Sequence, residues 1–214
     1  MISCVLFDFD GVIADTERSN GDYLAQALSF FGIPFTQEDR LSLIGTNVAG
    51  TLDRFLQRAD PPLTREQLAR VRERLGNTYE DSPLFPQPGL REWLRELGHQ
   101  GIRTGVVSST STKYIVTALN RMGFTGQFQV IVCGDMVKRP KPAPDSYQLA
   151  MSLLGLSPEE CLAIEDSPTG IQAARAAGLQ VVGYKGGSVE QDTRKAHWEV
   201  RSFQEIPSLP PFRG

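Results

Sequence analysis

Five short apolar segments constrain the fold of this chain of 214 residues more than any other feature. Each segment is rich in valine and isoleucine, and its apolar residues follow one another without alternating polar positions. Such continuous runs are typical of strands that are buried on both faces, as in a parallel sheet between two layers of helices. The five predicted strands span residues 2–9, 102–108, 129–133, 161–165 and 180–184.

Helical patterns separate the last four predicted strands, at 112–122, 144–154 and 169–177. Gly155 and Gly178 directly follow the second and third of these segments, where they suit helix C-termini. Strand and helix therefore alternate along the chain. This alternation predicts an α/β fold whose core is a Rossmann-like, doubly wound parallel sheet.

The stretch after the first predicted strand has helical periodicity only. Its apolar residues form three stripes, at 23–31, 48–59 and 68–79. Thr64 and Gln67 have the spacing of a capping box just before the third stripe. We therefore expect a group of helices inserted between the first two strands.

Proline and glycine mark the return from this insert to the sheet. The segment DSPLFPQPG at 81–89 is a stiff, non-helical joint, and a further helix is expected around 90–97. The predicted organisation is an all-helical cap domain at 16–81 inserted into an α/β core formed by 1–15 and 82–214.

The composition argues against several classes of partner. The net charge is −3, without the basic stripe that nucleic acids or anionic membranes attract. No apolar run approaches membrane-spanning length, and the apolar start breaks off at Asp8, too early for a signal peptide. We expect a cytoplasmic protein that binds neither nucleic acid nor a membrane.

Cysteine and histidine offer little for catalysis. Cys4, Cys133 and Cys161 each lie in or beside an apolar run, which indicates reduced thiols in the core. The two histidines, His99 and His197, are far in sequence from every polar motif. A histidine nucleophile or relay is therefore not expected.

Polar side chains follow the predicted strands at the point where each strand ends. They are Asp8 and Asp10 after the first strand, Ser108, Ser109 and Thr110 after the second, Lys141 some way after the third, and Glu165 and Asp166 at the end of the fourth. In open α/β sheets, ligands bind at the carboxyl ends of the strands. These side chains are therefore the first candidates for a functional site.

Four carboxylates at one edge of a sheet would repel one another unless a cation lay among them, and oxygen ligands of this kind suit Mg²⁺. Asp8 and Asp10 are two residues apart, so both side chains lie on one face of an extended strand while Phe9 packs inward. A turn-forming role also fits Asp-Phe-Asp-Gly alone. That alternative leaves the gathering of acids, hydroxyls and an amine unexplained.

Four motifs together resemble the haloacid dehalogenase-like hydrolase superfamily. They are DFDGVIADTE, VVSSTS, KPAPDSY and EDSPTGIQAARAAG, in the order and spacing of that superfamily. The chain is most similar to the branch that contains phosphoglycolate phosphatase and β-phosphoglucomutase-like proteins, which carry a helical cap. The resemblance extends from residue 1 to about residue 185.

The resemblance implies a role for each polar side chain at the strand ends. Asp8 would be the nucleophile that forms an aspartyl-phosphate, and Asp10 would be the acid and then the base. Ser108 would donate a hydrogen bond to the phosphoryl group, and Lys141 would neutralise its charge. Lys138 is the alternative cation, but the sequence that follows Lys141 matches the family.

The resemblance also implies a Mg²⁺ site and a substrate pocket. Asp166 would bind the metal with the Asp8 side chain and the Asp10 main-chain carbonyl, while Glu165 would act directly or through water. The candidates for substrate contact are Ser109, Thr16, Thr46 and Asn47. For Thr46 and Asn47, capping of the following helix is an equally good explanation.

We predict a Mg²⁺-dependent phosphatase that hydrolyses a small phosphorylated metabolite, either a sugar phosphate or a phosphoglycolate-like acid. Asp10 favours phosphoryl transfer over dehalogenation, since dehalogenases of the superfamily lack this residue. A β-phosphoglucomutase is the alternative, because Thr16 is retained. Against it, Asn20, Val48 and Ser111 replace a histidine, an arginine and a lysine of the mutase pattern.

Two further classes of function remain alternatives. A receiver-like signalling domain also collects aspartates, a hydroxyl and a lysine at one end of a sheet, and a noncatalytic binding protein could use the same scaffold. The helical insert and Asp10 argue against a receiver. The resemblance also implies a monomer.

Overall fold

The protein is described here from a computed structural model, which covers residues 2–43 and 48–212. Its centre is a six-stranded sheet in which all neighbouring strands are parallel. The strands are β1 (Cys4–Phe7), β2 (Arg103–Val107), β3 (Val130–Val132), β4 (Cys161–Glu165), β5 (Gln180–Tyr184) and β6 (Trp198–Val200). Their order across the sheet is β3-β2-β1-β4-β5-β6, which is that of a doubly wound Rossmann-type fold and confirms the predicted fold class.

The sheet contains one strand that the sequence did not predict. The five predicted strands are present. β1 covers only half of the predicted range 2–9, and β2 and β3 are each one residue shorter than expected at both ends. The additional strand, β6, lies at the edge of the sheet, and only Val200 of its three residues is buried. A three-residue edge strand has no continuous apolar run, so the pattern that revealed the others could not reveal it.

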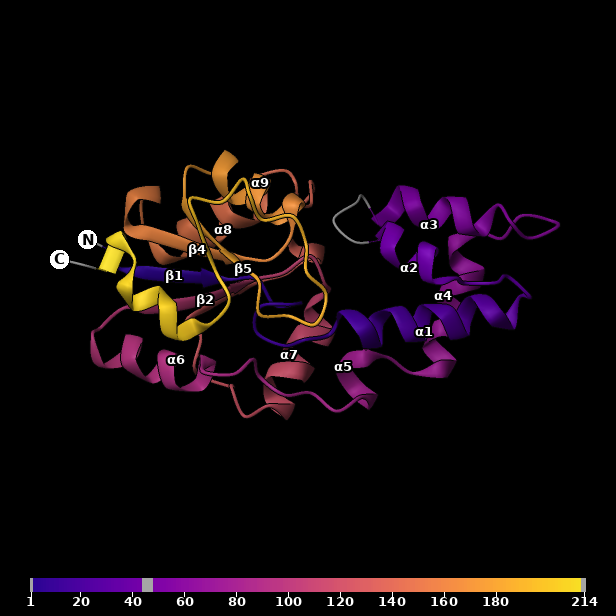
Figure 1. The fold of residues 1–214 in the computed structure, drawn as a ribbon, viewed down its shortest axis with the longest axis horizontal. Helices are drawn as coiled ribbons and strands as arrows, with labels where there is room; N and C mark the ends of the chain where they lie inside the picture. Colours follow the sequence, from indigo (N-terminus) through magenta and orange to yellow (C-terminus); the bar gives the residue numbers. More distant parts are fainter. Residues whose placement is uncertain (1, 44–47, 213–214) are drawn as a thin grey trace.

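Helices cover both faces of the sheet, as Figure 1 shows. One face is covered by α6 (Leu90–His99) and α7 (Thr112–Arg121), and the other by α8 (Asp145–Leu154) and α9 (Pro168–Ala176).

The buried side chains of β1 explain its continuously apolar sequence. Val5 and Phe7 join the hydrophobic cluster under α6 and α7, whereas Cys4 and Leu6 join the cluster under α8 and α9. A strand buried on both faces gains about 1.5–3 kcal/mol for each large apolar side chain. If polar and apolar residues alternated along β1, the strand would lose this free energy on one face of the sheet.

A second group of helices lies beyond the carboxyl ends of the strands, to the right in Figure 1. It consists of α1 (Glu17–Phe30), α2 (Gln37–Leu43), α3 (Val48–Leu56) and α4 (Arg65–Leu75), which we call the helical insert. Its own core includes Leu24, Leu28, Phe55 and Leu68. Helix α4 begins at the predicted capping box, where Thr64 and Gln67 exchange both hydrogen bonds.

The short helix α5 (Thr78–Asp81) leads from the insert back to the core. Tyr79 belongs to the core cluster and stacks on Tyr114 of α7, with ring centroids 5.5 Å apart. The chain is therefore anchored to the core before the proline-rich joint. The domain boundaries at 16 and 81 stay a prediction.

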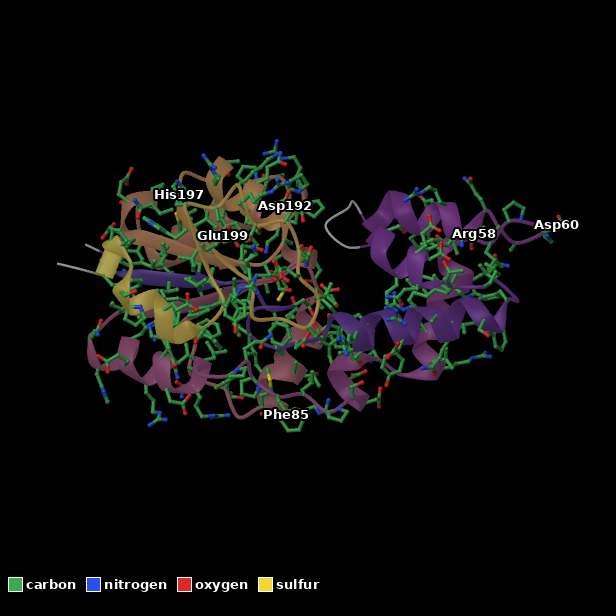
Figure 2. All side chains as sticks on the ribbon, viewed as in Figure 1. Arg58, Asp60, Phe85, Asp192, His197 and Glu199 are labelled. Carbon is green, nitrogen blue, oxygen red and sulfur yellow. The ribbon has the colours of Figure 1, made fainter. Side chains whose placement is uncertain are left out.

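The three cysteines are buried, and one histidine makes a hydrogen bond with the backbone. Cys4, Cys133 and Cys161 are buried free thiols, as expected. His197, labelled in Figure 2, accepts a hydrogen bond at Nδ1 from the Val181 amide at 3.0 Å. Within residues 2–43 and 48–212, no helix has both the length and the apolarity that a membrane span requires.

Candidate functional site

The two central strands bring three carboxylates together. The Asp8 amide donates to the carbonyl oxygen of Ile164 at 2.9 Å, which holds Asp8 beside the end of β4. Glu165 is the last residue of β4, and Asp166 follows it. Oxygen atoms of Asp8, Glu165 and Asp166 all lie within 4.8 Å of one another. Because β1 and β4 flank the point where the strand order reverses, this cluster lies where doubly wound folds bind ligands.

Lys141 is the cation of this cluster. Its Nζ donates to Asp8 Oδ1 at 2.7 Å, to Glu165 Oε1 at 2.6 Å and to the Val107 carbonyl at 2.8 Å. Its side chain is only 4% exposed. Lys138 is exposed, so the structure places Lys141 of the two at the carboxylates. The peptide bond between Lys141 and Pro142, which the sequence left open, is cis.

One lysine does not balance three buried acids. Burial raises the pKa of Asp8 well above its usual value and Glu165 raises it further, although Lys141 opposes both. Burial, Asp8 and Glu165 raise the pKa of Asp166 in the same way. A divalent cation among these hard oxygen donors would remove that repulsion. The donor set therefore fits Mg²⁺.

Gly11 gives Asp166 the room to approach β1. Its φ angle is +81°, a conformation that side chains rarely adopt. A Cβ atom at this position would lie 2.0 Å from Asp166 Oδ2. Asp166 Oδ2 also accepts a hydrogen bond from Gln191 Nε2 at 3.0 Å. The turn after β1 is thus shaped around the carboxylate of Asp166.

Three hydroxyl groups from three parts of the chain orient the Asp10 carboxylate. Thr16 and Tyr79 donate to Oδ1 at 2.5 Å and 2.7 Å, and Thr110 donates to Oδ2 at 2.9 Å. Burial and the charge of Asp10 raise the pKa of Tyr79 well above its usual value, so its phenol stays protonated. Thr16 is fully buried. Its predicted contact with substrate stays a prediction.

The serines after β2 take different positions. Ser108 is buried, and its Oγ accepts from the Thr110 amide at 3.0 Å, which leaves its own proton available to donate. Ser109 is exposed. Thr46 and Asn47 lie outside the described residues.

A cavity of about 980 Å³, which we call the central cavity, lies against these residues. From the core it is lined by, among others, Asp8, Asp10, Ser109, Thr110, Lys141 and Asp166, and from the helical insert by Glu17, Arg18, Asn20, Arg40 and Arg72. Arg54 and Arg58 line a separate cavity of about 370 Å³ within the insert. Figure 2 shows Arg58 in the helical insert, well away from the core.

Two residues beside the acids were not recognised from the sequence. Tyr147 is fully buried and donates to Glu165 Oε1 at 2.6 Å. In the sequence it was visible as the last residue of the KPAPDSY motif. Tyr79 was assigned to an apolar stripe, and its hydroxyl gave no sign of a partner 69 positions away. Gln191, which donates to Asp166, gave no signal in the sequence either.

Comparisons with known proteins agree on one family. The family described as haloacid dehalogenase-like hydrolase matches residues 5–184. Phosphoglycolate phosphatase of Photorhabdus laumondii is 32% identical over 192 residues, which cover 87% of this chain and 81% of that protein. The structure of CbbY from Rhodobacter sphaeroides in complex with phosphate has a TM-score of 0.80 and 30% identity, and the match covers 96% of each chain.

A solved mutase is also similar to this chain. The structure of β-phosphoglucomutase from Clostridium difficile has a TM-score of 0.78 and 26% identity. The match covers 97% of this chain and 96% of the mutase. Overall similarity therefore does not separate phosphatase from mutase chemistry.

Proposed function

Because the chain belongs to the family of haloacid dehalogenase-like hydrolases, we propose that it is a Mg²⁺-dependent phosphatase acting on a small phosphorylated metabolite. The observation that supports this most is the contact of Lys141 Nζ with Asp8 and Glu165, next to Asp166. The residues proposed as nucleophile, cation and metal ligands thereby lie at one end of the sheet. Sugar phosphates and phosphoglycolate-like acids are the proposed substrates.

The acids at the strand ends would hold the metal. Asp8, Asp166 and the Asp10 main-chain carbonyl are the proposed ligands, with Glu165 acting directly or through water. When bound, Mg²⁺ would offset the negative charge of the phosphoryl group and of the ligating carboxylates.

In the first step, an oxygen of Asp8 attacks phosphorus while the bond from phosphorus to the leaving oxygen breaks. Asp10 gives a proton to that oxygen, and the product is an aspartyl-phosphate on Asp8. In the second step, Asp10 takes a proton from a water molecule that attacks phosphorus. The bond between phosphorus and Asp8 then breaks, which releases inorganic phosphate.

The remaining residues position and shield the phosphoryl group. Lys141 would neutralise oxygens on Asp8 and on the phosphoryl group, and Ser108 and Ser109 would donate hydrogen bonds to it. The helical insert, proposed as the cap domain, would exclude bulk water from the cavity while the aspartyl-phosphate forms. Thr16, Thr46 and Asn47 stay candidates for contact with the leaving group.

The test is hydrolysis of p-nitrophenyl phosphate by the purified protein with and without Mg²⁺. We expect metal-dependent release of phosphate, and a loss of kcat of about 10⁴-fold or more in Asp8→Asn, since that amide cannot act as the nucleophile. Asp192→Asn, on the exposed loop labelled in Figure 2, is the matched control and should retain activity. An active Asp8→Asn variant would contradict the proposal. An inactive wild-type protein would instead favour a receiver-like or noncatalytic domain.

One contact keeps mutase chemistry as the second candidate. The hydroxyl of Thr16, the residue that this chain shares with the mutase pattern, donates to Asp10 Oδ1. Conversion of β-glucose 1-phosphate into the 6-phosphate, without net release of phosphate, would favour the mutase. Release of phosphate from both esters would favour the phosphatase.

A further inference from the structure

A segment without helix or strand joins β5 to β6 and borders the central cavity. It spans residues 185–197, and we call it the strap. Its residues 188–191 line the cavity. Figure 1 shows the strap in gold, beside the stretch of chain that leads into α1. The proposed reaction gives this segment no part, although it lies next to the strand-end acids.

Both ends of the strap are fixed to the core. The ammonium group of Lys185 pairs with Glu190 and with Glu199 of β6, each at 3.2 Å. The hydroxyl of Thr193, which is 1% exposed, donates to the same Glu199. Thr193 also packs on β5, because a Cβ atom added to Gly183 would lie 2.6 Å from its own Cβ. The strap is therefore held against the sheet although it has no regular structure.

The middle of the strap is fixed to the turn after β1. Ser188 donates to Asp15 through both its amide and its hydroxyl. A Cβ atom on Gly187 would lie 3.4 Å from the Gly11 carbonyl oxygen, so the backbones of the strap and of the turn lie next to each other. Gly11 is also the residue that leaves room for the carboxylate of Asp166. The strap, this turn and Asp166 thus pack as one unit.

The side chain of Gln191 extends from the strap to Asp166. Its Nε2 donates to Asp166 Oδ2 at 3.0 Å, the one hydrogen bond that this carboxylate receives among the residues that the structure describes. The neighbouring Glu165 differs, since it accepts from the ammonium group of Lys141 and from the hydroxyl of Tyr147. An amide fixes the direction of a carboxylate without placing a positive charge beside it. In the described part of the chain, Asp166 is thus held by a neutral donor and Glu165 by a cation.

We propose that Gln191 is a positioning residue of the metal site, which orients the Asp166 carboxylate and thereby sets the affinity of the site for Mg²⁺. The inference rests on the proposed function, in which Asp166 is a metal ligand. Hydrogen bonds to ligating side chains fix their orientation, and their loss typically lowers metal affinity by about 10- to 100-fold. The strap, which fixes Gln191 in place, would then determine how much Mg²⁺ the protein needs.

The experiment measures Mg²⁺ binding without substrate, as the rise in melting temperature when the purified protein is titrated with MgCl₂. Gln191→Met keeps the approximate size of the side chain and removes its donor. Gln191→Lys keeps a donor but adds a positive charge beside Asp166. Gln180→Met is the matched control, because Gln180 is the exposed first residue of β5, at the end of that strand opposite to the strap.

We expect Gln191→Met to need about tenfold more Mg²⁺ for the same rise in melting temperature, and Gln180→Met to need the wild-type amount. At saturating Mg²⁺, Gln191→Met should recover the wild-type kcat with p-nitrophenyl phosphate, which a damaged fold would not. Gln191→Lys should bind Mg²⁺ more weakly still, yet be the most stable variant without the metal, since its ammonium group offsets the charge of Asp166.

An unchanged Mg²⁺ requirement in Gln191→Met would overturn this inference and leave the proposed function standing. A loss of kcat in Gln191→Met that saturating Mg²⁺ does not restore would also overturn it, because the residue would then support the fold rather than the metal site. A wild-type protein that Mg²⁺ does not stabilise would overturn both the inference and the metal dependence of the proposed function.

Discussion

The two walls of the central cavity use charge in different ways. On the core side, the Lys141 side chain is 4% exposed and its partner Glu165 is fully buried, and each has several fixed partners. On the wall formed by the helical insert, the pair of Arg40 with Asp22 is 28% and 62% exposed. One wall holds its charges out of water, and the other keeps them hydrated.

This difference determines how well each wall tolerates amino-acid substitutions. Removing one partner of a buried ion pair leaves an uncompensated charge and costs about 3–5 kcal/mol, whereas exposed pairs contribute about 1 kcal/mol or less. The core wall is therefore interdependent, and most single substitutions there should disturb several groups. The helical insert can exchange one charged residue for another at little cost to the fold.

The largest effect is expected for Lys141→Met. Without its ammonium group, Asp8, Glu165 and Asp166 repel one another, so the free energy of unfolding should fall by about 3 kcal/mol at pH 8 without Mg²⁺. Because burial already raises the pKa of Asp8 and Asp166, these acids take up protons as the pH falls, and the loss should be smaller at pH 5.5. Urea unfolding at both pH values measures this.

Lys138→Met is the control for this prediction, since Lys138 lies in the same loop but is exposed. It should change stability by less than about 0.5 kcal/mol. Equal effects of the two substitutions would mean that the core wall is no more interdependent than the surface.

The next effect is expected for Gly11→Ala. The new Cβ would combine a strained φ of +81° with a contact of 2.0 Å to Asp166. We expect a loss of about 2 kcal/mol in stability and a tenfold or greater rise in the Mg²⁺ concentration needed for half-maximal activity.

Gly101→Ala separates strain from crowding. Gly101 has a φ of +70°, and a Cβ there would meet nothing within 4 Å. It should cost about 1 kcal/mol from backbone strain alone and leave the Mg²⁺ requirement unaltered. A Mg²⁺ effect in Gly101→Ala but not in Gly11→Ala would refute the role of the turn at Gly11.

Glu17 lies in the first turn of α1, and the charge of Asp10 in the core acts on it. Its substitution therefore tests the boundary between the two walls. Burial, Asp10 and Asp15 raise the pKa of Glu17 from 4.5 to about 7. The folded state then binds more protons than the unfolded state between these values, so stability falls as the pH rises through this window. Glu17→Gln removes this loss, and because the side chain is only partly buried the variant should gain about 1–2 kcal/mol at pH 8 and little at pH 4.5. The exposed Glu38→Gln should show no such pH-dependent gain.

The smallest effect is expected in the insert, for Asp39→Asn. Hydrogen bonds from Arg58 hold the pKa of Asp39 well below its usual range. A lowered pKa means that the contribution is present at neutral pH and is lost as the pH falls below about 4. We expect a loss of about 1 kcal/mol at pH 7 that shrinks toward pH 3, measured by thermal or urea unfolding. Asp60→Asn, at the exposed loop labelled in Figure 2, should be neutral.

The sequence predicted the sheet and the strand-end acids because both follow from local patterns. Continuous apolar runs identified the buried strands, and the rule for parallel sheets then placed Asp8 and Asp166 at one edge. The sequence did not predict that the Tyr79 hydroxyl donates a hydrogen bond to Asp10, or that the Tyr147 hydroxyl donates one to Glu165. Those contacts join residues that no periodicity relates, and they depend on how helices pack once the sheet has formed.

The segment after β5 shows how the site extends beyond its motifs. Ser188 donates to Asp15 through its amide and its hydroxyl, at 3.0 Å and 2.8 Å, and Gln191 reaches Asp166. Yet the recognised family pattern ends at residue 184. Two relatives that agree in every motif can thus differ in this segment. They would then differ in the surroundings of the acid at position 166, a proposed metal ligand, and of the residues before the insert. Classification by motifs alone would group such enzymes together even where their metal requirements or substrates diverge.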